Sequence, residues 1–312
     1  MRAIQQTAYG GPEVLTDVTL PRPIPGPGEV LVEVSAAGLN PSDWKHREMP
    51  GYIDSLPFIS GWDVSGVVHE VGPGVALHSR GDEVMGMLPY PHGHGAFAEY
   101  VLAPARALVP KPDCLTFTQA AVVPLGGLTA WQALVDTAQV RPGERVLVHA
   151  AAGGVGHLAV QIAKARGAYV IGTASKARHD FLRELGVDEH LDYRSDDLAS
   201  LPPVDVVVDT IGGDTARRSL AILAPGGRIV SLTLFALPPN WLQLVAELAP
   251  DVVAYRMLVE TDQAGLLHVK NLVDTGKLRP HIHATYPLDK LPEAQIESAE
   301  GHCAGKIVIE VK

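Results

Sequence analysis

The chain has very little cysteine: Cys114 and Cys303 are the only two in 312 residues. So few cysteines exclude a disulfide scaffold and most multi-cysteine zinc modules, and they fit a reducing compartment. Aromatic residues make up only 5% of the sequence, whereas glycine (31) and proline (25) are frequent. We therefore expect a core of valine, alanine and leucine with many turns, in a chain long enough for about two domains.

Basic residues are scarce relative to acidic ones. Lys and Arg number 25 against 35 Asp and Glu, which gives a formal net charge of −10. No basic block offsets this excess, so binding to nucleic acid or to an anionic membrane surface is disfavoured. Hydrophobic residues at 46% and charged residues at 19% also exclude a disordered chain.

Hydrophobic runs of the membrane-spanning kind are also missing. The uncharged stretches 114–135 and 146–163 approach the necessary length, but they contain glycines and polar residues, as buried strand–turn–helix elements do. The first six residues lack the apolar segment of a signal peptide. We expect a cytoplasmic protein without membrane partners.

The predicted secondary structure changes at about residue 119. Before it, β-branched runs bounded by Gly and Pro, such as 30–34 and 64–68, predict strands. After it, short apolar strands alternate with helical segments, which indicates a parallel sheet covered on both faces. The tail, 306–311, returns to strand character and is expected to rejoin the first part.

Individual elements of the second part can be placed from the same patterns. Apolar runs predict strands at 146–148, 169–172, 204–208, 228–232 and 252–255. Helical spacing predicts helices at 119–136, 154–166 and 177–185, with Gly126-Gly127 as a weak point in the first.

A glycine-rich turn follows the first of these strands. Residues 146–156 read Val-Leu-Val-His-Ala-Ala-Ala-Gly-Gly-Val-Gly, so Gly153 and Gly156 take the second and third positions of G-x-G-x-x-G, with Ala151 at the first. One glycine lets the backbone approach a pyrophosphate, and the next lets the helix pack closely on the strand. The helix N-terminus would hold the phosphates with free N–H groups. The alternative is an ordinary tight turn.

The choice of dinucleotide depends on the end of the next strand. NAD sites usually place Asp or Glu there, whereas this chain has a hydroxyl and two cations, Ser175, Lys176 and Arg178. A 2′-phosphate needs such donors, and each charged hydrogen bond contributes roughly 1.5–3 kcal/mol. We therefore expect NADPH as the cofactor. The alternative is that Lys176 and Arg178 form a solvated helix start.

Motifs in a fixed order extend over essentially the whole chain. They are 37–44, 61–68, 81–84, 95–100, 124–131, the glycine turn, 209–213 and 305–308. With them the chain resembles the medium-chain dehydrogenase/reductase superfamily and, more narrowly, its zinc-independent quinone oxidoreductase branch, which includes zeta-crystallin and the enone reductases. The resemblance implies an α/β protein with a GroES-like β-rich catalytic domain (1–122 with 270–312) and a doubly wound, NADP-binding Rossmann domain (123–269).

The resemblance also bears on metal binding. Zinc alcohol dehydrogenases place a cysteine where this chain has Asn40 and a histidine where it has Trp62, and their four-cysteine lobe is missing. A structural zinc needs four N or S ligands, so we expect no metal. His92 and His94 are the remaining metal-like pair, and without a third partner they are more typical of a solvated or packed loop.

Site residues carry over from the resemblance position by position. It implies catalytic roles on the substrate side for Asn40, Asp43 and Tyr52. On the cofactor side it implies that Thr129 lies by the nicotinamide and that the pyrophosphate is held by Ala151, Gly153, Gly154, Val155 and Gly156. The 2′-phosphate and adenine would be held by Ser175, Lys176, Arg178 and Tyr193. The ribose and nicotinamide would be contacted by Gly212, Leu232 and Leu234, with Lys306 near the cofactor. Asn40 and Asp43 could instead cap a turn and a helix, and Tyr52 could pack in a loop.

The expected reaction is hydride transfer from NADPH to a quinone ring or to the β-carbon of an enone. Donors such as the Asn40 amide would stabilise the oxyanion, and Tyr52 or water would supply a proton. One alternative is an NADPH-binding protein of zeta-crystallin type with little turnover. A zinc-type alcohol dehydrogenase is a further alternative that Asn40 and Trp62 oppose. By analogy with relatives we also expect a homodimer paired near 252–255.

Overall fold

The computed structural model describes residues 1–51, 53, 55–233 and 236–312. By their internal contacts the residues form two compact units. The first, here called the β unit, comprises Met1–Leu128, Glu260–Asp274 and Pro280–Lys312. The second, the parallel-sheet unit, comprises Thr129–Val259 and Thr275–Arg279.

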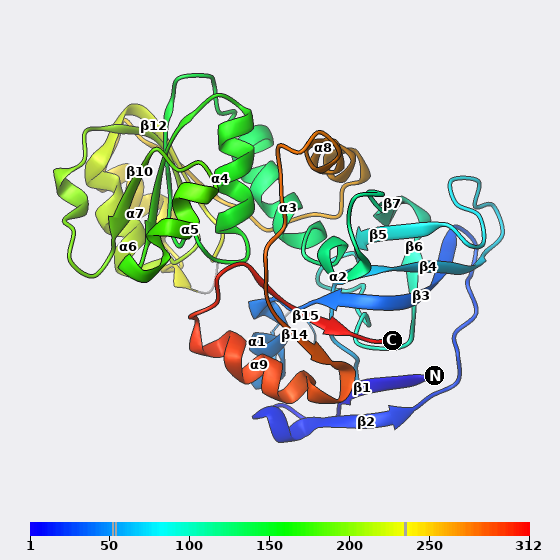
Figure 1. The fold of residues 1–312 in the computed structure, drawn as a ribbon. Helices are drawn as coiled ribbons and strands as arrows, with labels where there is room; N and C mark the ends of the chain where they lie inside the picture. Colours follow the sequence, from blue (N-terminus) through cyan, green and yellow to red (C-terminus); the bar gives the residue numbers. More distant parts are fainter. Residues whose placement is uncertain (52, 54, 234–235) are drawn as a thin grey trace. The chain divides into compact units, whose positions relative to one another are not determined.

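The β unit is built on a mainly antiparallel sheet (Figure 1). The strand order is β14–β15–β3–β4–β5–β7, and β6 also pairs with β3. The bounds are β3 (Glu29–Gly38), β4 (Asp63–Val71), β5 (Glu83–Met87), β6 (Tyr100–Pro104), β7 (Leu108–Pro110), β14 (Ile282–Pro287) and β15 (Lys306–Glu310), with a separate antiparallel pair of β1 (Arg2–Gln6) and β2 (Leu15–Thr19). The C-terminal strand β15 pairs antiparallel with β3, so the prediction that the tail rejoins the first part is confirmed.

Short helices surround this sheet. They are α1 (Pro41–Glu48), α2 (Phe117–Ala120), α8 (Gln263–Asp274) and α9 (Leu291–Glu300), with 3-10 turns at Pro12–Val14, Ala105–Ala107 and Leu288–Lys290. Gly38 ends β3 where α2 and β4 come closest, because a Cβ there would lie 2.3 Å from the Ala121 carbonyl oxygen and 3.0 Å from the Asp63 Cβ. This close approach brings the start of α1 next to Asp63.

The parallel-sheet unit contains a sheet in the order β10–β9–β8–β11–β12–β13, with every neighbouring pair parallel. The bounds are β8 (Arg145–Val148), β9 (Tyr169–Ala174), β10 (Glu189–Asp192), β11 (Val204–Asp209), β12 (Leu223–Ser231) and β13 (Val253–Arg256). In chain order this is 3-2-1-4-5-6, the Rossmann arrangement, in which ligands bind where the order reverses. That point lies between β8 and β11, and the predicted α/β fold is confirmed.

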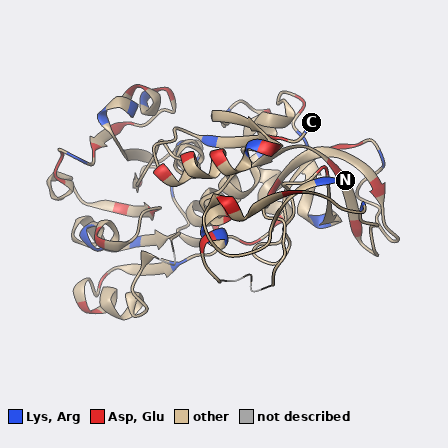
Figure 2. Ribbon diagram, turned by 90° about the horizontal axis from the view of Figure 1, so that it is seen from below, with Lys and Arg blue, Asp and Glu red and all other residues tan. Residues whose placement is uncertain are grey.

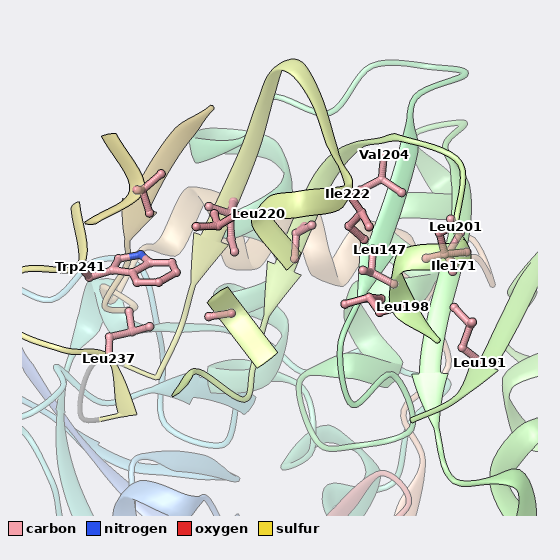
Figure 3. Packing of buried hydrophobic residues seen from close by; sticks show 14 residues of the cluster. Leu147, Ile171, Leu191, Leu198, Leu201, Val204, Leu220, Ile222, Leu237 and Trp241 are labelled. Carbon is pink, nitrogen blue, oxygen red and sulfur yellow. The ribbon is translucent and has the colours of Figure 1, made fainter. Parts of the chain in front are cut away.

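Helices follow the strands of this sheet. They are α4 (Gly156–Ala165), α5 (His179–Glu184), α6 (Gly213–Ser219) and α7 (Trp241–Leu248), with shorter turns at Lys176–Arg178, Leu198–Ser200 and Leu220–Ile222. One face of the sheet, with Leu147, Ile171 and Ile229, packs against Leu220 and Trp241 in a buried cluster (Figure 3). Because side chains alternate along a strand, Val146 and Val148 point to the other face. α4 contacts β8 and β9.

The predicted helix 119–136 is divided differently from the expectation. α2 ends at Ala120, and α3 (Pro124–Trp131) runs straight through Gly126 and Gly127 into a π-helical stretch, Gln132–Thr137. A Cβ on Gly127 would lie 2.9 Å from the Val269 Cγ1 atom. Glycine here permits close packing between α3 and α8, so it does not interrupt the helix.

The structural division also differs from the expected domain boundaries at 122/123 and 269/270. The first boundary falls inside α3, after Leu128, and residues 260–274 belong to the β unit. Side chains explain the second shift: Gln263 Nε2 donates to the Leu108 carbonyl at 2.8 Å, and Thr261 Oγ1 donates to the Leu88 carbonyl at 3.2 Å. In the part of the chain that the structure describes, no helix is long and apolar enough to cross a membrane.

Candidate functional site

Charged side chains are mostly kept at the surface of each unit. Figure 2 shows acidic and basic positions interspersed over the ribbons, whose strands are drawn mainly in tan. The exceptions are informative, because a buried charge is costly unless it is paired. The buried charged side chains include Asp43, Asp63 and Lys306 in the β unit, where Arg47 and Lys111 are also buried, and Asp209 in the parallel-sheet unit.

The glycine-rich turn joins the end of β8 to the start of α4. A Cβ on Gly156 would lie 2.2 Å from the Ala150 carbonyl oxygen, so only glycine lets α4 start this close to the strand. Gly153 is different, because a Cβ there would meet only the Ala150 oxygen, at 3.2 Å. Ala151 is fully buried, whereas Gly153, Gly154 and Val155 are partly exposed. The lack of a side chain at Gly153 and the N-terminus of α4 suit an approaching phosphate.

The ends of β9 and β10 lie side by side. Ala174 pairs with Asp192 in register, and the Tyr193 N–H donates to the Ala174 carbonyl at 3.3 Å. Ser175 and Tyr193 therefore follow adjacent strand ends. Lys176 is exposed, Arg178 is half-buried, and Arg194 Nε donates to Tyr193 Oη at 3.2 Å. Hydroxyls and cations gather here, with Arg194 as an additional cation.

Buried polar atoms collect at the ends of β11 and β12. Asp209 Oδ1 accepts from the Gly212 N–H at 2.8 Å, and the Leu232 N–H donates to the Asp209 carbonyl at 2.9 Å. Gly212 adopts φ 77°, and a Cβ there would lie 2.7 Å from Thr233 Oγ1. Among the described residues, Asp209 Oδ2, Ser231 Oγ and Thr233 Oγ1 are buried without a hydrogen-bond partner. Such orphaned atoms are typical of a site that a ligand or water completes.

These features fit a dinucleotide. Gly153, the start of α4, the cations after β9 and the orphaned polar atoms all lie at the carboxyl ends of parallel strands. Thr129 is buried on α3 at the start of the parallel-sheet unit. Leu234 lies outside the described residues.

A second polar cluster lies in the β unit. Asp63 Oδ1 accepts from the Leu125 N–H at 2.5 Å, and Asp63 Oδ2 accepts from Asn40 Nδ2 at 2.7 Å. Lys306 Nζ forms a buried ion pair with the same Oδ2 atom, the two side chains being 3% and 0% exposed. The structure thus brings Asn40 and Lys306 together through Asp63, which the sequence patterns did not single out as a site residue.

Asn40 and Asp43 form the N-terminal cap of α1. Asp43 Oδ2 accepts from the Asn40 N–H at 2.7 Å, and the Asn40 carbonyl accepts from the Asp43 N–H at 3.0 Å. Burial raises the pKa of the Asp43 carboxyl to about 8, and Asp63 adds to this, so Asp43 is mostly protonated at neutral pH. Asn40 Nδ2 also contacts the Gly38 carbonyl at 3.4 Å, so both amide hydrogens have acceptors. Tyr52 lies outside the described residues.

Trp62 occupies an aromatic pocket. The indole is fully buried, its Nε1 donates to the Pro91 carbonyl at 3.3 Å, and its ring lies 5.1 Å from that of Tyr90 and 5.6 Å from that of His46. His94 packs edge-on to Phe58 at 5.2 Å and lines an open groove of about 340 Å³.

No group of three or more His, Cys, Asp or Glu side chains in the described part of the chain could hold a metal ion. The residues here do not fit a zinc ion.

Two family models match the chain. Residues 26–113 match the alcohol dehydrogenase GroES-like domain, and residues 185–309 match the zinc-binding dehydrogenase model. Together with the fold, these matches indicate the medium-chain dehydrogenase/reductase superfamily.

Individual relatives narrow this class. The chain is 35% identical to the chloroplast envelope quinone oxidoreductase homolog of Arabidopsis thaliana over 99% of this chain and 98% of that protein. It superposes on the quinone oxidoreductase of Coxiella burnetii with a TM-score of 0.92, at 39% identity over 100% and 99% of the two chains. A mycobacterial protein solved in complex with NADPH gives a TM-score of 0.90, at 31% identity over the full length of both chains. The chain belongs to the quinone oxidoreductase branch of this superfamily and is an oxidoreductase that uses a nicotinamide cofactor.

Proposed function

We propose that this protein is an NADPH-dependent reductase that transfers a hydride to a quinone or to an α,β-unsaturated carbonyl without zinc. The observation that carries the proposal is the end of β9, where Ser175 and Lys176 follow Ala174 in place of the Asp or Glu of an NAD site, with Arg178 and Tyr193 as further donors; the carboxylate at these strand ends, Asp192, belongs to β10. A 2′-phosphate recruits hydroxyls and cations, whereas a free 2′-hydroxyl is usually held by Asp or Glu. The quinone oxidoreductase relatives support the substrate class.

Zinc independence rests on the chemistry of the side chains present. Asn40 and Trp62 stand where zinc alcohol dehydrogenases have Cys and His, and neither an amide nor an indole is a usual zinc ligand. The Asp63 carboxylate, which could bind a cation, is already paired with Lys306 and hydrogen-bonded by Asn40. A zinc ion would have to displace both partners.

Without a metal, protein donors must stabilise the charge that forms on the substrate oxygen. When bound, the nicotinamide supplies the hydride. The Asn40 amide could reach a substrate oxygen only by releasing one of its two acceptors, and the 3.4 Å contact with the Gly38 carbonyl is the weaker of them. Asp43, fully buried, caps the helix that carries Asn40 and thereby fixes its position. We propose that Tyr52 or water supplies the proton that the α-carbon of the substrate takes up.

The test follows NADPH and NADH oxidation with panels of quinones and enones. We expect consumption of NADPH, with a preference over NADH that falls roughly tenfold in Lys176→Ala and in Arg178→Ala, because each removes a charged hydrogen-bond donor. Activity should survive dialysis against a chelator.

The matched control is Arg183→Ala. Arg183 is an exposed cation on α5 that pairs with Asp180, so its removal should leave the cofactor preference unchanged. A preference for NADH in the parent protein would overturn the cofactor assignment. Tight NADPH binding without turnover on any quinone or enone would instead support a storage or binding role.

A further inference from the structure

His149 is a buried histidine at the start of the dinucleotide turn. It directly follows β8, and it is 3% exposed. The ring reaches two other elements: Nδ1 lies 3.2 Å from Thr173 Oγ1 on β9, and Nε2 lies 2.8 Å from Ser219 Oγ on α6. Its backbone is bonded to β11, since its N–H donates to the Val208 carbonyl at 3.0 Å and its carbonyl accepts from Thr210 Oγ1 at 2.8 Å.

The surrounding bonds determine which ring nitrogen carries the proton. Ser219 Oγ donates its single hydrogen to the Thr215 carbonyl, 2.8 Å away, because a carbonyl can only accept. Ser219 must therefore accept a hydrogen from His149 Nε2. In the neutral ring Nδ1 is then the acceptor, and it receives the hydroxyl hydrogen of Thr173.

Burial supports the neutral form. It lowers the pKa of His149 to about 4, with Asp209 on β11 opposing and Arg218 on α6 adding to the shift. The ring is therefore uncharged at neutral pH. In a protonated ring both nitrogens are donors, so Nδ1 could not accept the hydroxyl hydrogen of Thr173. The hydrogen bonds around His149 therefore require the neutral ring.

The network ends at the residue that shapes the turn. Thr173 Oγ1 accepts the Ala150 N–H at 3.2 Å, and Ala150 has φ 45°, a left-handed conformation that non-glycine residues seldom adopt. This conformation directs the Ala150 carbonyl across the turn, where it accepts from the Gly153 N–H at 2.9 Å and lies against Gly156. Holding Ala150 in place therefore holds Gly153 in place.

We propose that His149 is a positioning residue for the cofactor: its neutral Nε2–H tautomer, acting through Thr173, fixes Ala150 in the left-handed conformation that opens the turn to a pyrophosphate. The inference rests on the proposed dinucleotide function. It predicts that His149 supports binding of the pyrophosphate and leaves binding of the adenosine 2′-phosphate end unchanged.

The first measurement compares two ligands by fluorescence and calorimetry. NADPH carries the pyrophosphate, whereas adenosine 2′-monophosphate carries only the 2′-phosphate end. His149→Leu removes both ring bonds and should weaken NADPH binding by about tenfold or more, while adenosine 2′-monophosphate binds as before. His149→Gln, which keeps a donor for Ser219, should fall between Leu and the parent. Thr173→Val should weaken NADPH binding as His149→Leu does and provides the test should that variant fail to fold.

The matched control is His78→Gln. His78 is also buried and makes one hydrogen bond, to the Ala105 carbonyl at 2.9 Å, but it belongs to the β unit and should not affect NADPH binding. Equal loss for both ligands in the His149 variants would indicate general damage and overturn the positioning role, as would unchanged NADPH binding. Failure of the parent protein to bind either dinucleotide would instead overturn the proposed function itself.

The second measurement does not involve a ligand. Long-range ¹H–¹⁵N correlation spectra of the free protein should show His149 as the neutral Nε2–H tautomer, identified by the signals that His149→Gln removes. A Nδ1–H tautomer or a charged ring at neutral pH would contradict the hydrogen-bond directions and overturn the inference.

Discussion

At the scale of single residues, the buried pair of Asp63 and Lys306 should matter most for stability. Lys306→Met leaves the Asp63 carboxylate buried with an amide and a backbone N–H but no cation. Removing one partner of a buried ion pair typically costs about 3–5 kcal/mol of unfolding free energy. Urea denaturation should show this loss, and Asp63→Asn in the same chain should restore part of it.

An exposed pair provides the control for this prediction. Lys290 and Glu293 form an ion pair in which both side chains are about half exposed, so Lys290→Met should have a far smaller effect. If Lys306→Met were no more destabilising than Lys290→Met, the buried pair would not stabilise the β unit.

Asp43 should give the protein a characteristic pH dependence. Its pKa is about 8 in the folded chain, against a value near 4 for an unfolded one. Between these values the folded state binds more protons, so this group lowers the unfolding free energy as pH rises from about 4 to 8. Asp43→Asn cannot ionise. Its stability relative to the parent should therefore rise from about pH 5 to pH 8 and then level off.

The comparison with the parent isolates Asp43. His149 has the opposite effect: because its pKa is lowered in the folded chain, its contribution to the unfolding free energy is lost as pH falls from about 6.5 to 4. His149 is present in both proteins, so its contribution cancels in the difference between them. A difference in unfolding free energy that stayed constant over this pH range would show that Asp43 is ionised in the folded chain.

The sequence allowed only part of this site to be predicted. Asn40 and Trp62 could be recognised as poor zinc ligands from residue type alone. That the Asn40 amide is occupied by Asp63 and Gly38 could not be read in advance, because it depends on β3, β4 and α2 meeting at Gly38. The role of Lys306 as the partner of Asp63 depends on the same tertiary contacts. The cofactor role implied for Lys306 stays a prediction.

At the scale of elements, the two glycines of the dinucleotide turn should separate folding from binding. Gly156→Ala places a Cβ 2.2 Å from the Ala150 carbonyl oxygen, so α4 must move off the strand and we expect a loss of about 2–4 kcal/mol. Gly153→Ala meets the same oxygen at 3.2 Å, a tight contact that a shift of a few tenths of an ångström relieves, so it should destabilise the fold much less than Gly156→Ala does.

The two variants should rank in the opposite order for NADPH binding, with Gly153→Ala the more affected. Gly153→Ala should weaken NADPH at least about tenfold, because its methyl group occupies the space a pyrophosphate would use. Each variant is therefore the control for the other. If Gly153→Ala bound NADPH as tightly as the parent while remaining folded, the pyrophosphate would not approach this turn.

Strands could be predicted where their residues are buried on both faces. Strands such as β8 and β11 are apolar because both faces are covered, and their predicted positions are confirmed. β10 was not predicted as a strand, because Glu189, His190 and Asp192 give this edge strand no apolar run. Gly127 was predicted as a weak point of a helix, but its close contact with Val269 requires α8, which is distant in sequence.

At the scale of the whole molecule, the sheet order leaves β13 at an edge, as was expected for the segment near 252–255. The Met257 N–H donates to the Ser231 carbonyl of β12. N–H groups alternate in direction along a strand, so those of Tyr255 and Val253 also face β12, whereas those of Ala254 and Arg256 face outward. Among the described residues no further strand pairs with the outer side of β13, so this edge offers backbone donors to a second copy of the chain.

If two copies pair at this edge, proline at an outward position should separate them. Ala254→Pro removes an N–H that β12 does not use, so each sheet should keep its own hydrogen bonds while pairing between copies is lost. Light scattering after size-exclusion chromatography should give twice the chain mass for the parent and the single chain mass for Ala254→Pro. Ala254→Gly, which retains the N–H, should remain a dimer. A dimer that persists with proline would place the contact on another surface, and a monomeric parent protein would remove the expectation of a homodimer altogether.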